Sequence, residues 1–120
     1  MPIIEVEIVV DSSETEIAIP VQKLADALGG VLETKPGGTW VKVRTLAAGD
    51  YAENGASDPP RPVFVRVLKA GAGSADDRRR EAPLLARAVA DIVDRPAENV
   101  HILYEPPARG RIAFGGELRD

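Results

Sequence analysis

Residues 2–10 read Pro-Ile-Ile-Glu-Val-Glu-Ile-Val-Val, and the rest of the chain is interpreted from this stretch. Ile and Val dominate it, and Glu5 and Glu7 alternate with apolar neighbours, which predicts a β-strand with a polar face near its middle. The initiator Met1 is commonly removed when a small residue follows it. Its removal would leave Pro2 with a free secondary amine, a group that can act as a base near neutral pH. The plainer interpretation is that proline stands there only as a residue that permits Met removal.

The same pattern returns at residues 62–69, which read Pro-Val-Phe-Val-Arg-Val-Leu-Lys and predict another strand. Each of these strands is followed by a segment with apolar residues at helical spacing. We expect one helix from about residue 19 and a second over residues 76–94, where Pro83 indicates a kink or a late start. The apolar face of the first helix comprises Ile17, Val21, Leu24, Leu28 and Val31. Further strands are expected at residues 39–46, 100–104 and 111–114.

The chain therefore has the pattern β-α-β, linker, β-α-β, which predicts an α+β fold. We expect a single domain over residues 1–120, with repeat one at 2–46, a linker at 47–61 and repeat two at 62–118. Because β-α-β crossovers are right-handed, the two strands of each repeat should be parallel. The four main strands should form one sheet with both helices on one face. We expect oligomerisation to cover the other face, which carries Glu5, Glu7, Lys42, Arg44, Arg66 and His101.

Composition narrows the function classes. The 120 residues are 44% hydrophobic, which suits one globular domain with a modest core. The net charge is −4 and no basic run is suited to tracking a phosphate backbone, which argues against nucleic-acid binding. The chain has no cysteine and only one histidine, so we expect neither disulfides nor a metal site, and no other cofactor. Without a signal-peptide pattern or a long apolar run, the expected protein is cytoplasmic and does not bind membranes.

Three short motifs resemble those of the tautomerase superfamily, whose members use an amino-terminal proline. They are the Met1-Pro2 start, the Lys35-Pro36 turn and the glycine-containing tail of residues 109–118. The tail is similar to the C-terminal stretch of 4-oxalocrotonate tautomerase, and the turn is similar to that of macrophage migration inhibitory factor. The resemblance covers nearly the whole chain at the level of architecture. It implies a homotrimer in which residues 111–114 pair with a neighbouring subunit.

The resemblance also implies a site around Pro2, whose neutral nitrogen would move a proton next to a carbonyl group. Lys35 matches the pocket lysine of the inhibitory-factor branch and is expected to bind a substrate carboxylate. His101 stands where one branch has arginine and the other tyrosine, and is expected to reach in from a neighbouring subunit. Lys69 is a further candidate at the pocket rim. The plain alternatives for Lys35 and His101 are a solvated lysine at a helix end and a hydrogen-bonded histidine in a sheet.

The remaining candidates shape the pocket. Ile112 and Phe114 match the apolar wall that desolvates the proline in this family. Leu103 takes a position that is asparagine in the inhibitory-factor branch, which argues against a phenylpyruvate-type substrate. The arginine that clamps the far end of a dicarboxylate is replaced here by Ser12 or Ser13. The residues that could supply such a clamp instead are Arg44, Arg66, Arg109 and Arg111.

The expected function is a tautomerase or isomerase of small unsaturated 2-keto acids, with Pro2 as general base and a small-molecule carboxylate as substrate. A second interpretation keeps Pro2 protonated, as an acid in a hydratase-type dehalogenase or decarboxylase. A third is a non-enzymatic trimeric binding protein. Pro62 cannot duplicate the chemistry of Pro2, because its nitrogen is a tertiary amide, so each chain should carry one site.

Overall fold

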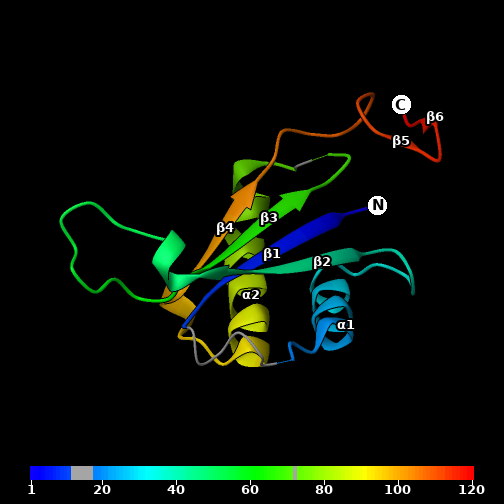
Figure 1. The fold of residues 1–120 in the computed structure, drawn as a ribbon. Helices are drawn as coiled ribbons and strands as arrows, with labels where there is room; N and C mark the ends of the chain where they lie inside the picture. The colour runs from blue at the N-terminus through cyan, green and yellow to red at the C-terminus, as the bar shows by residue number, and fades with distance from the viewer. Residues whose placement is uncertain (12–17, 72) are drawn as a thin grey trace.

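A computed structural model describes residues 1–11, 18–71 and 73–120 (Figure 1). The predicted residues Ser12, Ser13 and Ile17 lie outside this part of the chain. The main elements are β1 (Ile3–Val10), α1 (Val21–Val31), β2 (Trp40–Ala47), β3 (Val63–Leu68), α2 (Ala75–Val93), β4 (Val100–Tyr104), β5 (Ala113–Phe114) and β6 (Glu117–Leu118). Two short 3-10 turns, Ala48–Asp50 and Ala97–Asn99, lead out of β2 and into β4.

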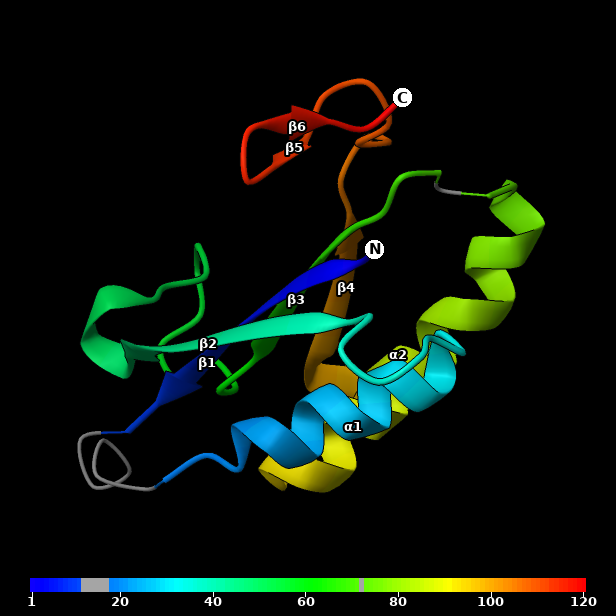
Figure 2. The ribbon, with the colours of Figure 1, turned by 90° about the vertical axis from the view of Figure 1, so that its right-hand side faces the viewer.

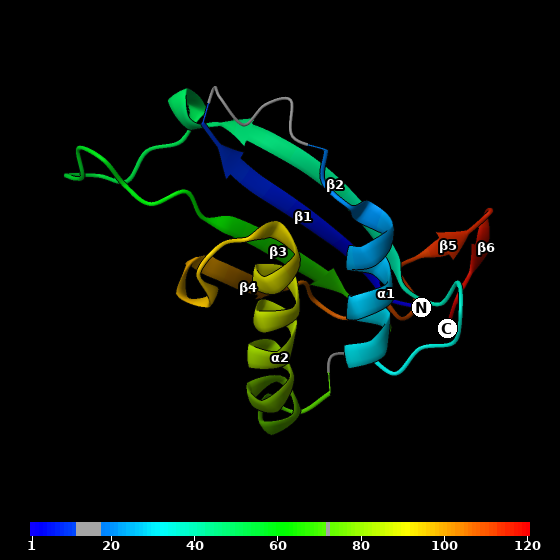
Figure 3. The same cartoon turned by 90° about the horizontal axis from the view of Figure 1, so that it is seen from below.

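The four long strands form one sheet in the order β2-β1-β3-β4. β1 pairs with β2, and β3 with β4, in parallel, whereas β1 and β3 are antiparallel. Both helices cover one face of this sheet (Figures 2 and 3). The predicted α+β fold, with one four-stranded sheet and two helices on the same side, is therefore confirmed.

The core lies between the sheet and the two helices. Alternate residues of β1, namely Ile4, Val6 and Ile8, point to this side and are almost completely buried. Leu24 and Leu28 from α1, with Leu85 and Val89 from α2, pack on the same cluster. Side chains of the intervening strand residues point to the opposite face, where Glu5 and Lys42 form an ion pair of 2.8 Å. The alternation in β1 thus places apolar side chains on the core face of the sheet and charged side chains on the opposite face.

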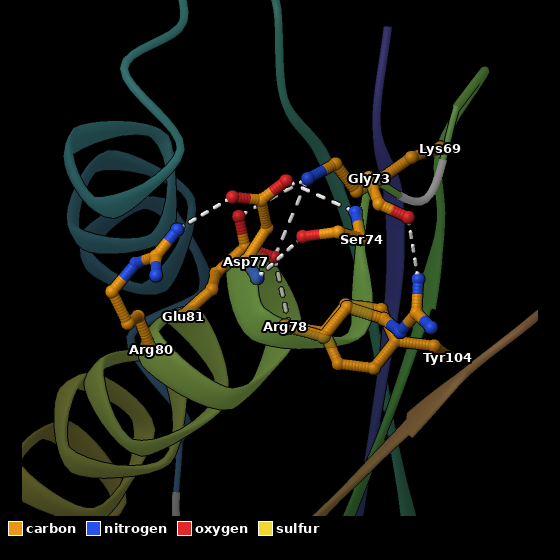
Figure 4. Close-up of polar contacts among 8 residues, drawn as sticks. All are labelled: Lys69, Gly73, Ser74, Asp77, Arg78, Arg80, Glu81 and Tyr104. Carbon is orange, nitrogen blue, oxygen red and sulfur yellow. Dashed lines mark hydrogen bonds and ion pairs between the residues drawn. The ribbon is translucent and has the colours of Figure 1, made fainter.

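The second helix differs from its prediction at the start. It begins at Ala75 and runs without interruption through Pro83, so the alternative of a late start is wrong. A capping box explains the early start: the Ser74 hydroxyl accepts from the Asp77 amide, and the Asp77 carboxylate accepts from the Ser74 amide, both at 3.0 Å (Figure 4). These hydrogen bonds to Ser74 hold the pKa of Asp77 below its usual value. α1 begins at Val21, two residues later than expected, with Pro20 as its N-cap.

The tail forms a small hairpin, of which the sequence pattern predicts only the first strand. β5 is shorter than the expected strand at 111–114, and it pairs with β6, an element that was not predicted. Gly115 and Gly116 connect the two strands, and both have positive φ, 58° and 89°. A two-residue hairpin turn of type I′ requires positive φ at both positions, which glycine adopts without strain. The turn therefore folds the last described residues back along the tail.

The two chain ends lie at the same end of the molecule, whereas the loop after β2 projects from the other (Figures 1 and 3). None of the described helices has the length and apolar character needed to span a membrane.

Candidate functional site

A hollow of about 390 Å³ lies beside the first residue of the chain, between β2 and the tail. Met1 is one of its lining residues and is 54% exposed. The other lining residues are Trp40, Ala70, Ala108, Arg109, Ile112, Phe114, Arg119 and Asp120. It thus combines apolar side chains with two arginines and one acidic side chain.

Pro2 follows Met1 in the chain, is buried, and is not one of the residues that line the hollow. Its carbonyl oxygen accepts a hydrogen bond from the Trp40 amide at 3.0 Å, which fixes it against β2. On the other side, Ile3 pairs with Leu68, so the next step of the ladder brings Pro2 alongside Lys69. Because Met1 lines the hollow, removal of Met1 would make the Pro2 nitrogen the chain terminus and would vacate the part of the hollow that Met1 borders.

Two aromatic rings form the apolar wall. Trp40 and Phe114 meet edge to face, with ring centroids 5.3 Å apart and an interplanar angle of 82°. The Trp40 indole nitrogen donates to the Gly37 carbonyl oxygen at 3.0 Å, which holds the ring in place. The structure therefore brings the predicted residues Ile112 and Phe114 into one hollow with Met1, and it adds Trp40, which sequence reasoning had placed only in a strand.

The two arginines among the lining residues come from the tail. Arg109 was one of four candidate arginines, whereas Arg119 was not considered. The Gly110 amide donates to the Arg119 carbonyl oxygen at 2.5 Å, so the backbones beside the two arginines are neighbours. The Gly115-Gly116 pair, a typical hairpin signal, was the feature of the sequence that could have revealed this arrangement.

Lys35 lies outside this hollow. It is exposed in the loop between α1 and β2, where it lines a separate depression together with Gly29 and Thr39. That loop leads to Trp40, but among the described residues Lys35 lines the depression beside α1, whereas Met1 lines the hollow beside the tail.

His101 and Leu103 lie on the open face of the sheet, in another hollow that also contains Arg44 and Arg66. The His101 ring is 5.8 Å from that of Phe64. Phe64 is paired with Glu7, five positions along β1 from Pro2, a separation of about 17 Å at the usual rise of a strand. Within one chain the structure therefore does not bring His101 or Leu103 to Pro2.

Lys69 is held by an ion pair on the helix-covered side. Its ammonium group contacts both carboxylate oxygens of Glu81, at 3.1 and 3.3 Å. The Tyr104 hydroxyl donates to the same carboxylate at 2.8 Å. These three residues join the ends of β3 and β4 to the first turns of α2 (Figure 4). Lys69 thus lies next to Pro2 along the ladder but directs its charge toward α2.

This cluster predicts an unusual titration of Tyr104. Burial, and then the hydrogen bond to Glu81, raise the pKa of the Tyr104 phenol above its usual value. Since the folded-state pKa is raised, the associated stability is present below about pH 10 and is lost as the phenol ionises at higher pH. We expect Glu81→Gln to lower the pKa of Tyr104 in a spectrophotometric titration of tyrosinate.

The matched control for that titration is Glu53→Gln. Glu53 raises the pKa of Tyr51, the other tyrosine, through a hydrogen bond of 2.5 Å. Glu53→Gln should therefore lower the pKa of Tyr51 and leave the pKa of Tyr104 unchanged. A Tyr104 transition unmoved by Glu81→Gln would contradict the assignment.

No protein-family model and no curated protein sequence matches the chain. Solved structures do match it. A fused 4-OT, a symmetric trimer, superposes with a TM-score of 0.75 at 14% identity, over 98% of this chain and 94% of the other. Macrophage migration inhibitory factor from Oncomelania hupensis gives 0.73 at 19% identity, over 100% and 83%. FG41 malonate semialdehyde decarboxylase, inhibited by 3-bromopropiolate, gives 0.67 at 20%, over 94% and 88%.

These likenesses extend over nearly the whole chain, at identities that establish the fold rather than an activity. They agree with the resemblance drawn from the Met1-Pro2 start and the tail. The chain has the fold of the tautomerase superfamily.

Proposed function

We propose that the protein is a tautomerase or isomerase of small unsaturated 2-keto acids, with Pro2 as the general base after removal of Met1. One observation carries this proposal: Met1 lines an apolar hollow to which two arginines also contribute, and Pro2 is the next residue of the chain. Removal of Met1 converts a backbone amide into a secondary amine at the wall of a substrate-sized space.

The chemistry needs two groups that the hollow can supply. A neutral amine removes a proton next to a carbonyl group, and returns it at another carbon of the conjugated system. Between these steps negative charge develops on the carbonyl oxygen, and nearby cations stabilise it. The apolar walls of Trp40 and Phe114 disfavour the charged amine and so favour its basic form.

The alternative is a protonated Pro2 that acts as an acid, in a hydratase-type dehalogenase or a decarboxylase. Arg109 and Arg119 line the same hollow, and positive charge near the amine disfavours its protonated form, which favours the neutral base. A pH–rate profile separates the two, because the activity of a neutral base rises as the amine loses its proton and that of an acid falls.

We also propose a cytoplasmic homotrimer in which residues 1–120 act as one domain. The face of the sheet opposite the helices supports the assembly. It carries ion pairs between Glu5 and Lys42 and between Arg66 and Glu105, beside the exposed ring of His101. In such a trimer His101 and Leu103 of one subunit could approach Pro2 of another. Light scattering on the purified protein gives the subunit number directly.

The test of the function uses full-length protein whose intact mass shows that Met1 is absent. We expect turnover of phenylenolpyruvate or 2-hydroxymuconate, and a loss of about 10²-fold or more in kcat for Pro2→Ala with the oligomeric state unchanged. Wild-type protein that lacks Met1 and turns over neither compound would contradict the proposal, as would wild-type protein that retains Met1. A third outcome, full activity of Pro2→Ala, would show that the reaction does not need the secondary amine of proline.

A further inference from the structure

We propose that Glu81, on the helix-covered side of the sheet, is a positioning residue for the candidate site, because it holds the segment of backbone to which the tail is hydrogen-bonded. Glu81 acts through Lys69 and Tyr104 and does not line the hollow itself. The inference rests on the proposed function, because it concerns the same hollow, but the position of the tail can be measured without turnover.

The tail beyond β4 is attached to two residues that follow β3. The Ala108 amide donates to the Lys69 carbonyl oxygen at 2.8 Å. The Arg109 amide donates to the Ala70 carbonyl oxygen at 3.1 Å. Ala70, Ala108 and Arg109 all line the hollow at the start of the chain, and Ala108 is almost completely buried. The position of residues 69 and 70 therefore determines where one wall of that hollow lies.

Glu81 fixes Lys69 from the side of α2. Its two carboxylate oxygens accept from the Lys69 ammonium group at 3.1 and 3.3 Å, and one of them also accepts from the Tyr104 hydroxyl at 2.8 Å (Figure 4). Tyr104 is paired with Val67 in the ladder, so one carboxylate connects the ends of β3 and β4 to α2. The Lys69 and Glu81 side chains are only 24% and 21% exposed. Solvent therefore screens this ion pair less than it screens the exposed pairs of the surface.

The start of α2 has no large apolar side chain that could make this connection instead. Residues 75–82 read Ala-Asp-Asp-Arg-Arg-Arg-Glu-Ala, and the first buried apolar side chain of the helix is Leu85. Asp76, also acidic, pairs with Arg79 of the helix itself. Glu81 precedes Leu85 by four residues, so the two side chains share the helix face that is turned to the sheet. At this end of α2 a carboxylate thus takes the place of a core residue.

The consequence for the reaction depends on which wall Glu81 holds. Loss of its carboxylate would release Lys69 and Ala70, and with them the tail residues that border the hollow. Pro2 precedes β1, which is paired with β2 and β3 along its whole central part. The amine would therefore keep its place while the opposite wall moves. Substrate binding should weaken more than proton transfer slows, which appears as a raised KM with a nearly constant kcat.

Amide hydrogen exchange, followed by NMR on the full-length protein, tests the position of the tail. The amides of Ala108 and Arg109 report on the tail, and the amide of Val6 in the central strand reports on opening of the whole fold. Glu81→Ala should speed exchange at both tail amides about tenfold, because hydrogen bonds to a charged group are lost. Glu81→Gln keeps an acceptor oxygen without the charge and should speed it only about threefold.

Two further variants of the same helix are the controls. Asp76→Ala removes an exposed carboxylate that pairs within the helix, so the tail amides should change by less than about twofold. Leu85→Ala weakens the core and should speed exchange at Val6 while the tail amides keep their rates. Tail amides that do not respond to Glu81→Ala would overturn the inference. Tail amides that respond as strongly to Leu85→Ala would also overturn it, because a general loss of stability would then suffice.

Kinetics separate this inference from the function on which it rests. With phenylenolpyruvate, Glu81→Ala should raise KM about tenfold and change kcat by less than about threefold. Faster exchange of the tail amides in a protein that turns over neither test substrate would retain the positioning role and remove the tautomerase. Unaltered exchange in an active enzyme would retain the tautomerase and remove the positioning role. Faster exchange with KM and kcat both unchanged would overturn the inference, because the tail wall would then take no part in the reaction.

Discussion

A chain that keeps any residue bonded to the Pro2 nitrogen is expected to turn over substrate about 10²–10⁴-fold more slowly than the Met1-free protein. The slower turnover has both a chemical and a steric cause. An amide nitrogen has no basic lone pair, and the extra residue occupies the hollow, as Met1 does. A one-residue extension that resists processing tests this without altering any side chain, and intact mass verifies it. The measurement is kcat with phenylenolpyruvate.

Pro2→Ala provides the comparison for that experiment. After Met removal, alanine still presents a primary amine, so a small residual rate should survive that the extended chain lacks. Equal activity of the extended and the processed chain would mean that the Pro2 nitrogen takes no part in the chemistry. Fold and assembly of the extended chain can be checked separately by circular dichroism and light scattering.

The second large effect concerns stability. Leu85 lies on α2 and is completely buried against the sheet. We expect Leu85→Ala to lower the free energy of unfolding by about 2–5 kcal/mol, because the lost methyl groups leave a cavity in a packed core. Urea denaturation followed by circular dichroism measures this change as a lower midpoint.

The neighbouring residue makes a strict control. Leu84 is the same residue type in the same helix turn, but it is 53% exposed. Leu84→Ala should change the free energy of unfolding by less than about 0.5 kcal/mol. Similar losses in the two variants would show that helix propensity, rather than burial, dominates at both positions. A larger loss at Leu84 would point to an interface that covers it in the assembled protein.

Most of the fold could be predicted because it follows from short-range patterns. The period of two in residues 3–10 and the helical spacing through Leu24 and Leu28 specify elements without reference to the rest of the chain. The start of α2 was harder, since Pro83 argued against a regular helix there. The Ser74–Asp77 capping box outweighed it, and such a box is itself a local signal that could have been used.

The candidate site was predictable only in part, because it depends on how distant segments meet. Pro2, Ile112 and Phe114 were identified from motifs, and the structure places Ile112 and Phe114 in the hollow that Met1, the residue before Pro2, also lines. Trp40 was read simply as a strand residue, since nothing in its neighbours reveals that a ring from the tail packs against it. Arg119 was missed for the same reason: its position depends on the turn that reverses the tail.

The tail that the Gly115-Gly116 turn folds back is made last, and this sets an order of events during synthesis. The first strand leaves the ribosome long before the tail that completes its surroundings, so Met1 is open to an aminopeptidase while the hollow is still unbuilt. If Met1 is removed as proposed, its removal would precede closure of the hollow, and the nascent chain would carry the Pro2 amine before the tail has folded beside it. A shortened chain that ends before residue 109 would expose that amine permanently. Such a chain would keep the first strand but would lack the tail residues that line the hollow beside it.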